Sequence, residues 1–263
     1  SRKNHSEVGS SFIHFNFTPD GDKTTPSLIG DVPRGVMLNQ PPIFLGGQGG
    51  IVGPVRLGFG NVVAAGTILR NDVVENNKLI VGKTHRGRIM DVAPKSYPGL
   101  RRIVENNTIY IANLLALEQW YLHARHQFLG RREFGDQIFS GLLAKLQMAK
   151  LERSRRLEAM AEKAAESPGA EKAELRRKME ALTAVFTVET ASSAAVDNRD
   201  RFLDKFQNHA AGGNENYIEC IQSLPAPLSL EGTYWLEGVV KAICLGVQEV
   251  LPSMRLFANL IEN

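Results

Sequence analysis

A run of six-residue units is the feature that most constrains how this chain can fold. The segments IVGPVR, LGFGNV and VAAGTI fill residues 51–68, each begins with an aliphatic residue, and a fourth unit opens at Leu69. Two further units, VGSSFI at 8–13 and IGDVPR at 29–34, lie upstream. A six-residue period with aliphatic first positions is typical of a parallel β-helix, in which three units make one triangular coil. A glycine-rich irregular β domain is the alternative interpretation.

The fifth position of each unit carries a second signal. Val55 and Thr67 are β-branched at this position, and Asn61 is the exception. In stacked coils the first-position side chains point inward, and small side chains fit the tight corners. Such coils leave their edges uncovered, so we expect them to stack and to oligomerise.

The two halves of the chain differ in composition. Residues 1–100 hold 15 of the 24 glycines and 8 of the 12 prolines, and the rest is rich in Ala, Leu, Glu, Lys and Arg. We therefore place a boundary near 93–99, with a β-helix domain over 1–94 and an α-helical domain over 95–263.

Apolar spacing predicts the helices of the second half. We expect one helix over 101–129 and a second, long helix that begins at Asp136. The sequence ESPGAE at 166–171 ends the long helix, and the chain resumes at Ala170 as an antiparallel partner helix. Shorter helices are expected at 197–209, 214–223, 229–250 and 252–261. The charged run at 145–180 mixes both signs, which favours a solvated helix face; binding to nucleic acid or to an anionic membrane is the alternative.

Composition narrows the class of protein. The formal charge is only +3 and hydrophobic residues make up 43% of the chain, as in ordinary globular proteins. No apolar run reaches the ~18–20 residues of a membrane span. No signal peptide is visible, and because the chain starts SRKNH without Met, we expect upstream residues to have been removed or left out. Cys220 and Cys244 fall in helical sequence, which predicts buried thiols in a reducing compartment, the cytoplasm.

Residues 8–31, VGSSFIHFNFTPDGDKTTPSLIGD, resemble a known family. They are similar to the left-handed β-helix acyltransferases, above all to the C-terminal acetyltransferase domain of the bacterial bifunctional UDP-N-acetylglucosamine pyrophosphorylase and glucosamine-1-phosphate acetyltransferase. Residues 51–73 resemble that domain's last full coil, and DVVENNKLIVGK at 72–83 resembles its exit strand. The likeness covers about residues 6–88. It implies a left-handed β-helix followed by the helical domain, and a homotrimer with acetyl-CoA, the co-substrate, in the groove between neighbouring β-helices.

The resemblance implies substrate-binding positions in the first loop. Asn16 would hydrogen-bond at the reacting end, and Phe17 and Lys23 stand where the family's loop Tyr and Lys meet a sugar phosphate. The alternative for Asn16, which the sequence favours equally, is a turn residue before TPDGD. The family's general base would lie upstream of Ser1, so His14 is the candidate base here; the alternative is a structural wall residue.

The resemblance also implies contacts with the coenzyme. Ser10 and Ala65 would offer backbone to its pantetheine arm, and Lys83, Arg86 and Arg88 would face its phosphates. A solvated exit loop is the alternative for KTHRGR.

Three departures from the family matter. Phe17 replaces a Tyr and loses a hydroxyl, and Glu7 stands at a polar family position, which puts the same sugar phosphate in doubt. Residues 35–50 are about ten longer than the family's stretch, and their diglycines suit either a ligand loop or a tight coil closure.

Metal chemistry has little support. His123 and His126 share a helix face, but no neighbouring Asp, Glu or Cys completes a ligand set, so no metal site is predicted. The expected function is that of a transferase, acting with acetyl-CoA on a sugar phosphate or nucleotide sugar or related to UDP-N-acetylglucosamine pyrophosphorylase. The alternative is a non-catalytic trimeric β-helix scaffold or regulatory module whose helical domain binds a partner. Nucleic-acid binding is a distant third interpretation.

Overall fold

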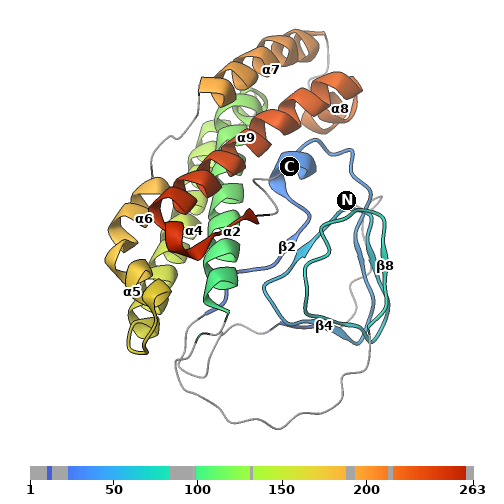
Figure 1. Cartoon of the computed structure of the whole chain (residues 1–263). Coiled ribbons are helices and arrows are strands. Elements are labelled where there is room, and N and C mark those ends of the chain that lie inside the picture. Colours follow the sequence, from blue (N-terminus) through green and yellow to red (C-terminus); the bar gives the residue numbers. More distant parts are fainter. Residues whose placement is uncertain are drawn as a thin grey trace.

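The computed structural model describes residues 11–13, 23–82, 97, 99–130, 133–187, 193–212 and 216–258. Helices make up 62% of this structure. They gather on one side of the molecule, and short strands occupy the other (Figure 1). We call residues 28–80 the strand region and the described residues from 100 to 258 the helical body.

The expected fold class, a left-handed parallel β-helix with a helical domain, is wrong. The structure is mainly helical, and its strands are only two or three residues long and form three small parallel sheets, with orders β1-β4-β7, β2-β5 and β3-β6-β8. The strands are β1 (Ser11–Ile13), β2 (Leu28–Ile29), β3 (Phe44–Leu45), β4 (Gly49–Ile51), β5 (Arg56–Leu57), β6 (Val62–Val63), β7 (Ile68–Leu69) and β8 (Leu79–Ile80). A period of six reports which side chains turn inward, but it reports neither handedness nor how far such strands extend.

Two of the strand pairings keep the six-residue spacing. Phe44 pairs with Val62, and Gly50 pairs with Ile68, so these partners lie eighteen residues, or three units, apart. The first-position residues Ile51, Leu57, Val63 and Leu69 are all buried in one small aliphatic core, as predicted. The fifth-position residues Val55, Asn61 and Thr67 are buried as well.

The outer face of the sheet β3-β6-β8 carries an apolar ladder. Phe44, Val62 and Leu79 occupy paired positions on its three strands, and they are 41%, 39% and 69% exposed. Figure 1 places β8 on the side of the strand region that faces away from the helices.

A short helix, α1 (Val32–Gly35), joins the strand region to the helical body. Asp31 caps it by accepting from the Arg34 backbone N–H at 3.0 Å, and Pro33 lies in its first turn, where a missing N–H costs nothing. The next residue but one, Met37, is buried in the core of the helical body.

The helical body largely follows the expected periodicity, but the helix expected over 252–261 is wrong, because a 3-10 turn occupies 252–254 and residues 255–257 are not helical. Its elements are α2 (Leu100–Trp120), the π-helix η1 (Tyr121–Arg125), α3 (His126–Leu129), α4 (Gly135–Ala164), α5 (Ala170–Arg177), α6 (Met179–Val185), α7 (Ser193–Ala211), α8 (Tyr217–Gln222), α9 (Ala226–Val250) and the 3-10 turn η2 (Pro252–Met254). The long helix from Asp136 is confirmed as α4. Its return partner is split into α5 and α6, because the backbone at Lys178 leaves the helical conformation.

Helix α9 lies at the centre of the body and packs against α2 and α7 (Figure 1). Aromatic rings fill this interface: Trp235 of α9 has its ring 6.3 Å from Trp120 and 5.7 Å from Phe202. Gly232 allows the close approach, because a Cβ there would lie 2.6 Å from Met37 and 2.8 Å from Phe202. Within the described ranges, no helix combines the length and apolar character that crossing a bilayer would require.

Candidate functional site

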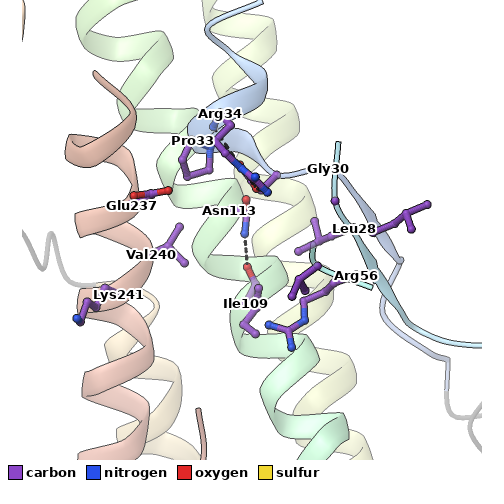
Figure 2. A pocket seen from close by; sticks show the side chains of 14 residues that line it. Leu28, Gly30, Pro33, Arg34, Arg56, Ile109, Asn113, Glu237, Val240 and Lys241 are labelled. Carbon is purple, nitrogen blue, oxygen red and sulfur yellow. Dashed lines mark hydrogen bonds and ion pairs between the residues drawn. The ribbon is translucent and has the colours of Figure 1, made fainter. Parts of the chain in front are cut away.

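A cavity of about 400 Å³ lies between the strand region and the helical body. We call it the seam cavity. Strand turns and α1 form one wall, and α2 and α9 form the other (Figure 2). Its apolar lining includes Leu28, Leu57, Ile109 and Val240. Charged and amide side chains interrupt this lining at defined places, as is usual for ligand pockets.

One end of the seam cavity is built by the start of α1. Arg34 donates from Nε to Asp31 Oδ2 at 2.7 Å, and its Nη2 forms an ion pair with the same oxygen. Its Nη1 donates to Asn76 Oδ1 at 3.2 Å, and its guanidinium lies 4.9 Å from the centre of the Phe59 ring. These contacts fix Arg34 within the strand region.

Asn113 of α2 holds this end in place. Its Oδ1 accepts from the Val32 backbone N–H at 2.9 Å, and its Nδ2 donates to the Ile109 carbonyl at 2.9 Å (Figure 2). Both polar ends of a buried amide are thus satisfied, and α1 is fastened to α2.

Arg56 lines the cavity from β5. Its Nε donates to Asp72 Oδ2 at 3.0 Å, and Asp72 Oδ1 accepts a second hydrogen bond, from Arg102 Nη2 of α2, at 3.2 Å. The carboxylate therefore lies between two guanidinium groups, and the trio keeps a net positive charge. Arg102 also donates to the Pro54 carbonyl at 3.1 Å, so this trio spans the seam.

Helix α9 contributes Glu237 and Lys241, which lie one helical turn apart and line the cavity. Both residues are exposed to solvent. Within the described residues neither side chain forms an ion pair or hydrogen bond, in contrast to Arg34 and Arg56. The protein atoms packed around the Glu237 carboxyl raise its pKa above the ordinary value, Asp31 adds to this rise, and Arg34 acts in the opposite direction.

Most of the site residues predicted from the sequence lie outside the described residues: Ser10, His14, Asn16, Phe17, Lys83, Arg86 and Arg88. Lys23 is described and exposed. The hydrogen bond from Arg156 lowers the pKa of Glu152 on α4, and Lys23 adds only the smallest contribution to that lowering. Ala65 is exposed on a turn, with its backbone close against Gly46. Neither Lys23 nor Ala65 lines the seam cavity.

Sequence reasoning missed the residues that do line it. The segment IGDVPR was interpreted as a six-residue unit, although Asp31 followed by Pro33 is also a helix-start signal. That signal would have placed Arg34 on a helix. Glu237 and Lys241 carried no comparable signal, because only the packing of α9 brings them to the strand region.

The histidine pair on the π-helix and α3 does not converge. The His123 ring lies 6.1 Å from Trp235, whereas the His126 ring stacks on Phe139 at 4.2 Å. Among the described residues, no group of three His, Cys, Asp or Glu side chains is placed to hold a metal ion.

Three comparisons with known proteins give no match. No family model, no curated protein and no solved structure matches the chain.

Proposed function

We propose that the chain binds a sugar phosphate or a nucleotide sugar in the seam cavity, and that it acts as a transferase or as part of one. The observation that carries the binding proposal is the combination of Arg56 and Lys241 with the carboxyls of Asp31 and Glu237 around an apolar floor. Lys and Arg bind phosphate, and carboxyl oxygens accept hydrogen bonds from sugar hydroxyls. The transferase assignment rests on the sequence resemblance of residues 6–88 and not on the cavity.

Acetyl-CoA is the proposed acyl donor, on the same sequence grounds. Lys23 and Ala65 are both exposed, so a ligand can reach them. Calorimetric titration with acetyl-CoA tests this part separately, and no heat of binding at millimolar ligand would refute it.

Calorimetry also tests the seam cavity. Glucose 1-phosphate and UDP-N-acetylglucosamine are titrated into the protein, and we expect dissociation constants below about 1 mM for at least one of them. Lys241→Ala should weaken binding by about tenfold, since it removes a cation from the lining of the cavity. Lys145→Ala is the matched control, because Lys145 is an exposed lysine of α4 outside the cavity. Equal affinities in both variants would contradict the assignment of the site.

An oligomeric scaffold is the second candidate, and the ladder of Phe44, Val62 and Leu79 favours it. Three in-register apolar side chains on one exposed sheet face suit a second copy of the chain, and we propose a homotrimer. Sedimentation velocity should show the trimer, and Leu79→Glu should dissociate it. Ile218→Glu on α8, where Ile218 is 53% exposed, is the control and should leave the assembly intact.

We propose the cytoplasm as the compartment, because Cys220 and Cys244 are free, buried thiols. Nucleic acid is not a proposed partner. Several cations of the 145–180 run are held by acidic side chains, such as Arg156 by Glu152 at 2.8 Å and Lys150 by Glu118 at 2.7 Å.

A further inference from the structure

The two ends of the seam cavity differ in charge. Asp31 caps the start of α1 and lines the cavity there. Glu237 lies on the same side of Ile109 as α1, and Arg56 lies on the other side of Ile109 (Figure 2). The charges facing Glu237 come from Asp31 and from Arg34 of α1, with Lys241 one turn along α9 and Arg56 of β5 farther across the cavity.

Arg34 does not neutralise Glu237. All three of its side-chain nitrogens already bond within the strand region, two to Asp31 and one to Asn76. The Asp31–Arg34 pair has no net charge, so the Glu237 carboxylate leaves this end of the cavity negative at neutral pH.

We propose that Glu237 is a specificity-determining residue: it admits the neutral, hydroxylated end of a phosphorylated ligand and rejects a second anionic group there. The inference rests on the proposed function, because it assumes that the cavity binds a sugar phosphate. A carboxylate accepts hydrogen bonds from hydroxyl groups, whereas an apposed anion meets like-charge repulsion close to apolar walls. The phosphate is then directed to Arg56 and Lys241.

Protonation of Glu237 should relax this selection. Protein packing and Asp31 raise the pKa of Glu237, so its charge is lost at a higher pH than that of an ordinary glutamate. A nearby anionic group would raise this pKa further. Rejection of a second anion should therefore be strongest at neutral pH and should weaken as the pH falls through the raised pKa.

Two probes that differ in one group test the proposal. Glucose 1-phosphate carries a hydroxymethyl group where glucuronic acid 1-phosphate carries a carboxylate. At pH 7.5 we expect calorimetry to give at least about tenfold tighter binding of glucose 1-phosphate by the wild-type protein. Glu237→Gln should reduce that ratio to within about threefold, because the amide keeps a hydrogen-bond acceptor and loses the charge.

Two further variants complete the design. Glu237→Asp retains the charge and should retain the preference, and Glu249→Gln changes an exposed carboxyl of α9 outside the cavity and should leave the ratio unchanged. Thermal unfolding of each variant checks that it is folded, and repeating the wild-type titrations at pH 5 should narrow the ratio.

The possible failures are distinguishable. If the wild-type protein binds both probes and Glu237→Gln keeps the wild-type ratio, Glu237 does not determine specificity, and the cavity remains a sugar-phosphate site. If the wild-type protein binds neither probe at millimolar concentration, the proposed function fails, and the inference fails with it.

Discussion

The core of the helical body contains a cluster of aromatic rings, whereas the core of the strand region is small and entirely aliphatic. Trp120, Trp235, Phe202 and Phe206 are at most 1% exposed and lie in mutual ring contact. The strand region buries only Ile51, Val55, Leu57, Val63 and Leu69 in its cluster. Each aromatic side chain buries roughly 150–250 Å², so packing in the body does much of the stabilising.

In the strand region two buried polar side chains bond to the backbone of neighbouring turns. Asn61 is fully buried and makes three hydrogen bonds: its Nδ2 donates to the carbonyls of Val73 and Glu75, and its Oδ1 accepts from the Lys78 N–H. Thr67 is also buried, and its Oγ1 accepts from the Gly82 N–H at 3.0 Å. Strands of two or three residues satisfy few groups by themselves, so these side chains complete the turns.

The largest expected effect comes from Trp235→Ala in the helical body. Removal of a large ring from a packed aromatic core should lower the free energy of unfolding by about 3–5 kcal/mol. Urea unfolding followed by far-ultraviolet circular dichroism measures it. Tyr234→Ala is the neighbouring control, since Tyr234 is 54% exposed and should change stability by under about 0.5 kcal/mol. If Trp235→Ala lowered the free energy of unfolding as little as Tyr234→Ala, aromatic packing would not be what stabilises the helical body.

The thiol of Cys244 tests how closely the body is packed. Burial raises the pKa of Cys244 to about 12, against an ordinary thiol value of about 8.5. At pH 8 the native thiol should therefore react with iodoacetamide about a thousandfold more slowly than in the denatured chain, because only the thiolate reacts.

The same shift has a defined sign for stability. The contribution from burying the neutral Cys244 thiol is present below about pH 8.5, and it is lost as the pH rises toward about 12. Cys244→Ala should remove that part of the alkaline loss. Rapid native alkylation at pH 8 would show that α9 opens far more readily than its packing implies.

Asn61→Ala addresses the strand region. It removes three hydrogen bonds of a fully buried amide, to the Val73 and Glu75 carbonyls and from the Lys78 N–H, so stability should fall by about 2–3 kcal/mol. Asn71→Ala, at an exposed position of the same region, should have little effect. Equal results for the two variants in urea unfolding would mean that buried polar bonds do not hold the turns.

The smallest expected effect is that of Gly141→Ala on the free energy of unfolding, and its sign should be opposite to that of Gly46→Ala. Gly141 lies in α4 with open space around its Cβ position, so Gly141→Ala should stabilise the protein by about 0.5–1 kcal/mol. Gly46→Ala should instead destabilise it, because a Cβ there would lie 2.4 Å from the Ala65 backbone nitrogen. Thermal unfolding compares them, and stabilisation by both would contradict the tight turn-on-turn packing of the strand region.

Local sequence patterns predicted local structure well. Apolar periodicity located α4 and α9, and the six-residue spacing identified inward side chains such as Leu57 and Val63. Global architecture was not predictable from the same patterns. A spacing of six is compatible with a few short parallel strands packed on helices as well as with a long coil, and only long-range packing decides between them.

The candidate site shows the same limit. Asp31 and Glu237 are more than two hundred residues apart in the chain, and they meet because α9 packs against α1 and α2. The spacing of apolar residues on α9 indicates its buried face but not which neighbour its exposed Glu and Lys approach. Most residues predicted from the resemblance lie outside the described structure and stay predictions.

The pairing offset between successive turns of the strand region limits where insertions and deletions can fall. Phe44 pairs with Val62 eighteen residues later, and Val62 pairs with Leu79 seventeen residues later. All three side chains remain exposed, so a corner between strands absorbs a change of one residue. An insertion within a paired strand would instead exchange its buried and exposed side chains. Length variation should therefore fall at the corners, or in loops between strands such as the one after Gly35, where no pairing register is lost.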